Sequence, residues 1–246
     1  RPNLSARILI SSSLLYGYDD LKILHSRFAS KRLVNADGGQ GGTGKTTLAA
    51  ALAVEASRKG RDVALVDADP QQSLARWYQL RVEAEDDEPL LLIEADKPIE
   101  PKSEKIWVII DTPAALLPKI EDAINLANLV VIPARASAMD VDGILPVVAL
   151  CNRLAKPFVF VLTQTFADKT MNEGARAFLS AHGEVLEQEI ESRPSHSRAM
   201  LSGLTAAEYE PRGAVAKEIA ALWSDIEELA TGKRKHNKAA ARKAAS

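Results

Sequence analysis

The sequence has one cysteine, few aromatic residues and no long apolar run. Cys151 is alone among 246 residues, which excludes an intrachain disulfide and any metal centre built from several thiolates. Such a chain fits a reducing cytosol. No run approaches the roughly 20 apolar residues of a membrane-spanning helix, so we expect no membrane span. The stretch 8–15 lacks a small-residue cleavage site, so we expect no signal peptide either.

Charge is distributed unevenly along the chain. The net charge is −2, but residues 231–246 carry six positive charges and no acidic residue. Taking those six charges away leaves −8 for the remainder. An acidic body with a basic tail is typical of proteins that touch a polyanion through the tail.

Short apolar runs alternate with helical patterns through the middle of the chain. We expect strands near 33–34, 63–66, 90–93, 106–110, 129–132 and 158–162. We expect helices over 46–59, 73–82, 120–127, 141–154, 171–182 and 215–229. This alternation predicts an α/β fold with a mostly parallel, doubly wound sheet and helices on both faces. We place the folded domain at 31–230, an N-terminal extension with a helix near 19–28 at 1–30, and a basic, disordered tail at 231–246.

A complete P-loop pattern occupies residues 39–46, which read Gly-Gln-Gly-Gly-Thr-Gly-Lys-Thr. Its glycines let backbone amides approach phosphate oxygens. Lys45 is expected to reach the β- and γ-phosphates, and the Thr46 hydroxyl to bind Mg²⁺. The helix that begins here adds its positive end to the same anion. The pattern therefore predicts an ATP/ADP site with Mg²⁺.

Aspartates follow two of the predicted strands. Asp67 and Asp69 come after the strand 63–66, and Asp111 ends the apolar strand 106–110. A P-loop needs carboxylates at neighbouring strand ends to manage the metal ion and the attacking water. One aspartate at a strand end is usually a turn residue, but three beside a P-loop indicate a functional group.

Taken together, these segments resemble the ParA/MinD group of deviant Walker-A ATPases. The resemblance rests on Gln40–Thr47, on Val66-Asp67-Ala68-Asp69-Pro70-Gln71 and on Ile109–Pro113. It continues through 131–133, 137–140, 161–163 and 208–213. The Asp-x-Asp-Pro-Gln segment is typical of the ParA-like partition ATPases. The resemblance covers roughly residues 31–230.

The resemblance implies a function and a set of site residues. ParA-like proteins form an ATP-dependent homodimer, bind DNA without sequence preference and hydrolyse ATP slowly, usually stimulated by a ParB-like centromere-binding partner. Such a protein partitions plasmid or chromosomal DNA, and is cytoplasmic and nucleoid-associated. By the resemblance Asp69 positions the attacking water and Asp67 and Asp111 serve the metal side. The nucleotide contacts it implies are Gly41, Gly42, Thr43, Gly44, Lys45, Thr46, Thr47 and, near the adenine, Thr163.

The sequence departs from the group at Gln40. The group has a lysine there that reaches the partner's nucleotide across the dimer, and glutamine carries no charge. Cations supplied in this way are worth on the order of 10³–10⁵ in rate in analogous enzymes. A nucleotide-binding scaffold that does not hydrolyse ATP is therefore an alternative.

The basic residues favour DNA over a membrane. The tail's apolar residues are alanines, unlike the bulky residues of a membrane-binding amphipathic helix. Lysines and arginines that neutralise phosphates give salt-sensitive, sequence-independent DNA binding. A spatial regulator of the MinD or flagellar-number type and a small-molecule ligase of the same superfamily remain alternatives. The predicted DNA contacts are Arg193, Arg198, Lys233, Arg234 and Lys235.

Overall fold

The computed structural model describes most of the predicted domain. The described residues are 31–35, 42–84, 90–92, 106–113, 118–136, 138–168 and 170–235. The predicted helix at 19–28, the loop residues Gln40 and Gly41, and the tail from 236 onward lie outside them.

Eight strands of the described chain form one sheet, in which every pairing is parallel. The strand order is β3-β2-β4-β1-β5-β6-β7, and β8 pairs with β6. The strands are β1 (Lys31–Asn35), β2 (Val63–Asp67), β3 (Leu90–Leu92), β4 (Trp107–Asp111), β5 (Leu129–Arg135), β6 (Phe158–Thr165), β7 (Glu184–Val185) and β8 (Ile190–Glu191).

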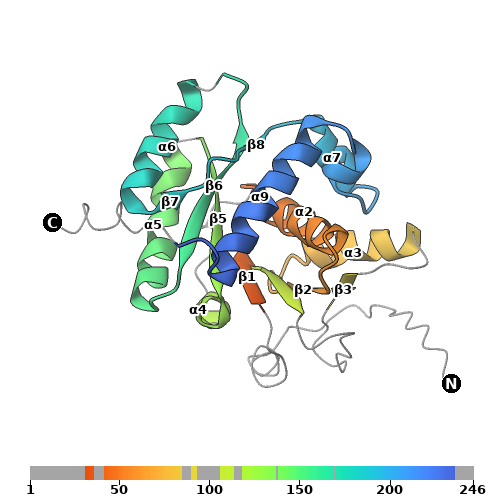
Figure 1. Cartoon of the computed structure of the whole chain (residues 1–246), viewed down its shortest axis with the longest axis horizontal. Helices are drawn as coiled ribbons and strands as arrows, with labels where there is room; N and C mark the ends of the chain where they lie inside the picture. The colour runs from red at the N-terminus through yellow and green to blue at the C-terminus, as the bar shows by residue number, and fades with distance from the viewer. Residues whose placement is uncertain are drawn as a thin grey trace.

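Eight described helices cover the two faces of this sheet. Figure 1 shows α2, α3 and α9 on one side, with α5 and α6 on the other. Each side has its own apolar core, and the edge-to-face pair Trp107–Trp223 joins the sheet to α9. The helices are α2 (Lys45–Arg58), α3 (Ser73–Ala84), α4 (Pro118–Leu126), α5 (Ala138–Arg153), α6 (Thr170–His182), α7 (Pro194–Met200), α8 (Ala206–Tyr209) and α9 (Ala214–Thr231).

The strand order creates a crevice at the carboxyl ends of β1 and β5. After β1 the chain crosses through α2 on one face of the sheet, whereas after β5 it crosses through α5 on the other. Adjacent parallel strands whose helices leave to opposite faces open a crevice, where ligands of doubly wound sheets bind. The described P-loop residues Gly42, Gly44, Lys45 and Thr46 line the cavity on this side of the sheet.

The predicted α/β fold with a parallel sheet is confirmed, and the six strands and six helices predicted within 31–230 are present. The sequence prediction omitted β7, β8, α7 and α8. Strands of two residues are too short to show a period. The two short helices did carry signals, namely Pro194 at the first position of α7 and a Thr205/Glu208 capping box on α8.

The turn between α7 and α8 is packed tightly against α3. Trp77 Nε1 donates to the Leu204 carbonyl over 3.1 Å, and buried Arg81 forms an ion pair of 2.8 Å with Glu208. Gly203 has a φ of +70°, and a Cβ placed on it would lie 2.4 Å from the Arg81 backbone nitrogen. Only glycine fits there, because a side chain at this position would collide with the Arg81 backbone.

Candidate functional site

The described half of the phosphate loop presents backbone amides to the crevice. Gly42 and Gly44 have φ values of +93° and +85°, which glycine adopts at little cost. Helix α2 begins directly after Gly44, with no side-chain cap and no acidic residue in its first turn. Its first amides therefore stay available to an anion, and the helix dipole favours one there.

Thr46 and Asp111 meet below the loop. Strands β2 and β4 are neighbours in register, which places Asp67 opposite Asp111 at the carboxyl edge of the sheet. The Thr46 hydroxyl donates to Asp111 Oδ2 over 2.6 Å. Burial raises the pKa of Asp111 to about 7, against the Thr46 hydrogen bond, which lowers it.

This pair fits a magnesium ion. Asp111 Oδ1 is buried and has no hydrogen-bond partner among the described residues, so one carboxylate oxygen is left for a cation or its water. No described cluster of three or more His, Cys, Asp or Glu residues exists that could hold a metal by itself. Mg²⁺ suits such a sparse site, because it keeps several waters and binds one or two protein oxygens together with phosphate oxygens.

Asp67 is bound to the loop that follows it. Its Oδ1 accepts from the Asp69 amide over 3.0 Å and its Oδ2 from the Ala75 amide over 2.9 Å. Burial raises the pKa of Asp67, and these amide bonds oppose the rise. Since both oxygens accept protein amides, Asp67 holds the segment 68–74 in place. Its predicted contribution to the metal side stays a prediction.

Asp69 lies on that segment and lines the cavity above the phosphate loop. Its Oδ1 accepts from the Gln71 amide over 2.9 Å. The placement brings a carboxylate from β2's end to the same cavity as Lys45 and Thr46, as the sequence predicts.

Strand β6 braces the opposite side of the loop. The Thr163 hydroxyl donates to the Thr43 carbonyl over 2.8 Å. The Gln164 side chain donates to the Gly42 carbonyl. The hydroxyl of Thr163 thus holds the phosphate loop, and the residue also lines the cavity. Its predicted place near the adenine stays a prediction. Gln164 was not predicted, because no motif marks it.

A cavity of about 780 Å³ extends from the phosphate loop to α7 and α9. Its loop end includes the predicted residues Gly42, Gly44, Lys45, Thr46 and Thr47. The far wall was not predicted, because it belongs to the short elements β8 and α7 that the sequence prediction omitted. That wall consists of Ile190, Glu191, Ser192, Arg193, His196, Ser197, Met200, Leu201 and Ile219.

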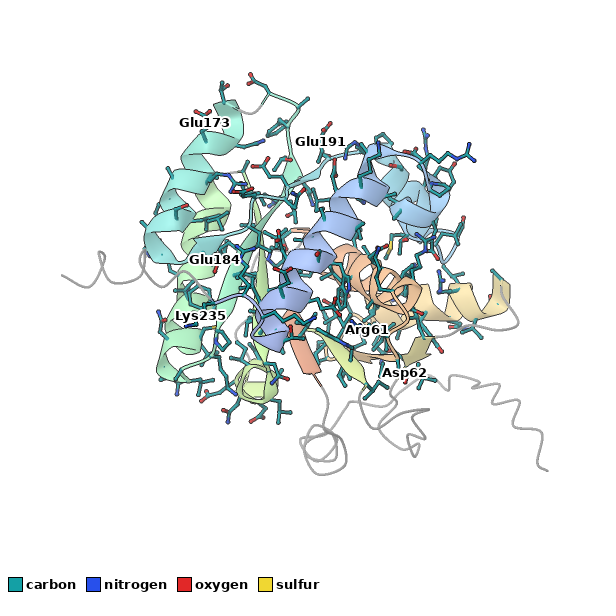
Figure 2. The ribbon with its side chains drawn as sticks, viewed as in Figure 1. Arg61, Asp62, Glu173, Glu184, Glu191 and Lys235 are labelled. Carbon is teal, nitrogen blue, oxygen red and sulfur yellow. The ribbon has the colours of Figure 1, made fainter. Side chains whose placement is uncertain are left out.

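Arg193 belongs to this wall and not to a free basic surface. Its guanidinium makes two hydrogen bonds of 2.8 Å to Glu218 on α9 and another of 2.8 Å to Glu191. Hydrogen bonding to Glu218 raises the pKa of Arg193. Figure 2 shows Glu191 beside the N-terminal end of α9. These carboxylates compensate the charge of the guanidinium, and the predicted DNA contact at Arg193 stays a prediction.

Arg234, at the start of the basic tail, also forms ion pairs with the folded domain. Arg234 binds Glu184 over 2.6 Å and Asp225 over 2.9 Å, so its charge is compensated as well. Figure 2 shows Glu184 and Lys235 near each other at the C-terminal end of α9. Of the predicted DNA contacts, Arg198, Lys233 and Lys235 are exposed.

Comparison with known proteins agrees with this site. The profile of the "CobQ/CobB/MinD/ParA nucleotide binding domain" matches residues 36–206. A maintenance of carboxysome distribution protein A from Gloeobacter kilaueensis is 30% identical over 207 residues, covering 80% of this chain and 93% of that protein. A probable plasmid-partitioning protein ParA from Thermus thermophilus is 33% identical over 104 residues. That alignment covers 42% of this chain and about a third (32%) of the ParA.

Solved structures share the fold. A putative plasmid partition protein from Borrelia burgdorferi bound to AMPPNP has a TM-score of 0.64 at 18% identity, covering 83% of this chain and all (100%) of that one. The septum site-determining protein MinD from Pyrococcus horikoshii, complexed with Mg-ADP, has a TM-score of 0.65 at 20% identity, covering 84% and 99%.

The family match spans most of the chain, including the P-loop, the three aspartates and the β6 brace. No helix in the described ranges has the length and apolar character to cross a membrane. The chain belongs to the CobQ/CobB/MinD/ParA family of P-loop nucleotide-binding proteins, with ParA and carboxysome-distribution proteins among its relatives.

Proposed function

We propose that this chain is an ATP-dependent spatial organiser that binds ATP and Mg²⁺, forms a homodimer and in that state binds DNA without sequence preference. Slow hydrolysis then releases the DNA, so that a cargo is distributed over the nucleoid. The observation that carries the proposal is the Thr46–Asp111 pair below the phosphate loop, with one buried carboxylate oxygen left for a cation.

Each described residue of the site has a task in this proposal. Lys45 and the first amides of α2 bind the phosphates, while Thr46 and Asp111 hold the metal ion, directly or through water. The bound Mg²⁺ neutralises charge on the phosphates. Asp69 orients the attacking water, and Asp67 keeps the Asp69 loop in position through its two amide bonds.

The proposed DNA surface consists of exposed cations outside the ion-pair networks. Arg198, Lys233 and Lys235 are exposed, whereas Arg193 and Arg234 are held by carboxylates. Phosphate neutralisation by such residues gives binding that weakens steeply with salt. A ParB-like protein that stimulates hydrolysis is the partner we propose for a DNA cargo.

The cargo has a second candidate. The carboxysome-distribution relative aligns over 93% of its length, much more than the Thermus ParA. Its name therefore supports positioning of a protein body across the nucleoid as the alternative to partition of plasmid or chromosomal DNA. In this proposal both cargo classes depend on the same ATP and DNA cycle.

The test is DNA binding by the purified chain with ATP–Mg²⁺, with ADP and without nucleotide, at two salt concentrations, alongside phosphate release. ATP-dependent and salt-sensitive binding to arbitrary DNA supports the proposal. ATP and DNA binding without phosphate release would identify a non-hydrolysing scaffold, consistent with glutamine at position 40. Absence of DNA binding in every nucleotide state would contradict the proposal, and binding to anionic liposomes instead would favour a MinD-type regulator.

A further inference from the structure

Strand β5 continues well past the end of its neighbour β1. The last paired residues of the two strands are Asn35 and Val131, and β5 runs four residues farther, to Arg135. At about 3.3 Å per residue the strand extends roughly 13 Å beyond the pairing. The end of β5 therefore stands beside the phosphate loop, which follows β1.

Alternation along β5 decides which face Arg135 occupies. Val131 packs in the core beneath α2, while Val130, Ile132 and Ala134 pack in the core beneath α5. Residues two apart share a face, so Arg135 lies on the α2 side, the side of the phosphate loop.

The side chain of Arg135 reaches that loop. A Cβ placed on Gly42 would lie 3.9 Å from Arg135 Nη1. Its register partner on β6 is Thr163, whose hydroxyl binds the Thr43 carbonyl. Arg135, Thr163 and Gln164 therefore approach two consecutive loop residues from two adjacent strand ends.

We propose that Arg135 is a phosphate-binding cation of this site, which contributes positive charge to the loop from a separate strand. The proposal rests on the proposed ATP binding. The segment 39–46 contains one cation of its own, Lys45, and glutamine at position 40 adds none. A nucleoside triphosphate brings several negative charges into a cavity that Asp69 lines, with Asp67 and Asp111 buried at the neighbouring strand ends. A guanidinium suits this place, because it binds phosphate through a planar fork of donors.

Another role for an arginine here is to brace the loop by shape and hydrogen bonding alone, as Thr163 does. The two roles differ in what glutamine can replace. Gln keeps side-chain donors but loses the charge, and Lys keeps the charge but loses the fork. Affinity for phosphates therefore follows charge in the first case and donor geometry in the second.

The experiment measures the Kd of a fluorescent ATP analogue and of the matching ADP and AMP analogues, without Mg²⁺ and at two salt concentrations. The variants are Arg135→Gln and Arg135→Lys. Arg153→Gln is the matched control, because Arg153 is an exposed arginine on α5 that pairs with Glu121. We expect Arg135→Gln to weaken ATP binding by about tenfold and AMP binding by less than about twofold, and to lower the salt dependence of ATP binding. The Kd of Arg135→Lys for ATP stays within about fivefold of that of the parent chain.

A second variant tests the charge directly. Arg135→Lys keeps a cation at this position without the planar fork, so retained ATP affinity in this variant identifies the charge as the contributing property. An equal loss of ATP and AMP affinity in Arg135→Gln would overturn the proposal, and so would a tenfold loss of ATP affinity in Arg135→Lys. Either result would mean that Arg135 only braces the loop by hydrogen bonding. If Arg135→Gln does not fold, the Kd values of Arg135→Lys for ATP and AMP, and their salt dependence, decide between the two roles by the same criteria. Failure of the parent chain to bind ATP would contradict the proposed function itself, a result distinct from any difference among the variants.

Discussion

The two sides of the phosphate loop have opposite chemistry. On the β2–β4 side the strand ends carry carboxylates, Asp67 and Asp111, which are buried and have raised pKa values. On the β5–β6 side the strand ends carry hydrogen-bond donors, with Thr163 and Gln164 on loop carbonyls and Arg135 beside Gly42. In the proposed function, the first side takes the cation and the second holds the loop against the anion. The same carboxyl edge of one sheet thus divides its work between metal and phosphate.

The largest expected effect comes from removing the metal-side carboxylate. Asp111→Asn keeps the shape but lowers phosphate release by about 100-fold, because the amide is a poor partner for Mg²⁺ or its water. A steady-state phosphate-release assay measures this loss, with Asp122→Asn on the opposite face of the sheet as the control. A loss below about threefold would mean that Asp111 does not serve the metal.

The next largest effect is expected from the hydrogen bonds that Asp67 accepts from the loop after β2. Asp67→Asn cannot accept from both the Asp69 and Ala75 amides, so the loop with Asp69 loosens and kcat falls by about tenfold, while Mg²⁺ and ATP affinity stay within about twofold. The unsatisfied amide also lowers the free energy of unfolding by about 1–3 kcal/mol. Titration of Mg²⁺ separates the roles, because a tenfold rise in the Mg²⁺ requirement would make Asp67 a metal-side residue after all.

The protonation of Asp111 gives a pH-dependent test of the difference between the two sides of the loop. Its pKa of about 7 lies above the ordinary value of 3.8 because of burial, so the folded chain binds this proton more tightly than the unfolded chain does. This group's contribution to the free energy of unfolding therefore falls as the pH rises from about 4 to about 7, and is level above that. Since Mg²⁺ competes with the proton, Mg²⁺-dependent ATP affinity rises by up to about tenfold from pH 6 to pH 8. Thermal unfolding and ATP titrations over this range check both trends, and Asp111→Asn removes them.

The smallest effect on ATP affinity is expected from Thr163, whose hydroxyl braces the phosphate loop. Thr163→Val removes the hydroxyl that binds the Thr43 carbonyl but keeps the shape, at a cost of about 1 kcal/mol, or roughly fivefold in ATP affinity. Calorimetric titration with ATP measures this change, and it is equal with and without Mg²⁺. A change seen only with Mg²⁺ would contradict the division between the two sides.

The sequence predicted the acidic side of the site well and the donor side poorly. Asp67 and Asp111 follow long apolar strands, and parallel strands bring their ends to one edge, so their meeting was predictable. Arg135 carried a weaker signal, since it ends the apolar run of β5 on the same face as Val131. Gln164 has a φ of +51° and binds the loop through tertiary contact alone, which no local pattern records.

The fold shows the same contrast between strong and weak local signals. Long strands and helices with clear periods were predicted within a few residues of their bounds. The cavity's far wall depends on β8 and α7, of two and seven residues. Their positions depend on tertiary contacts, of β8 with β6 and α9 and of α7 with α8. The ion pairs of Arg193 and Arg234 join residues 25 and 50 positions apart. No local sequence pattern therefore indicates that these two arginines are paired.

The most direct test of the division between the two sides is the Mg²⁺ dependence of ATP affinity in Asp111→Asn and Arg135→Gln, measured by calorimetry beside the parent chain. We predict that Asp111→Asn keeps the affinity seen without Mg²⁺ and loses the gain from Mg²⁺, whereas Arg135→Gln loses affinity by the same factor with and without Mg²⁺. Loss of the Mg²⁺ gain in both variants, or in neither, would contradict a site in which one side serves the metal and the other the phosphates.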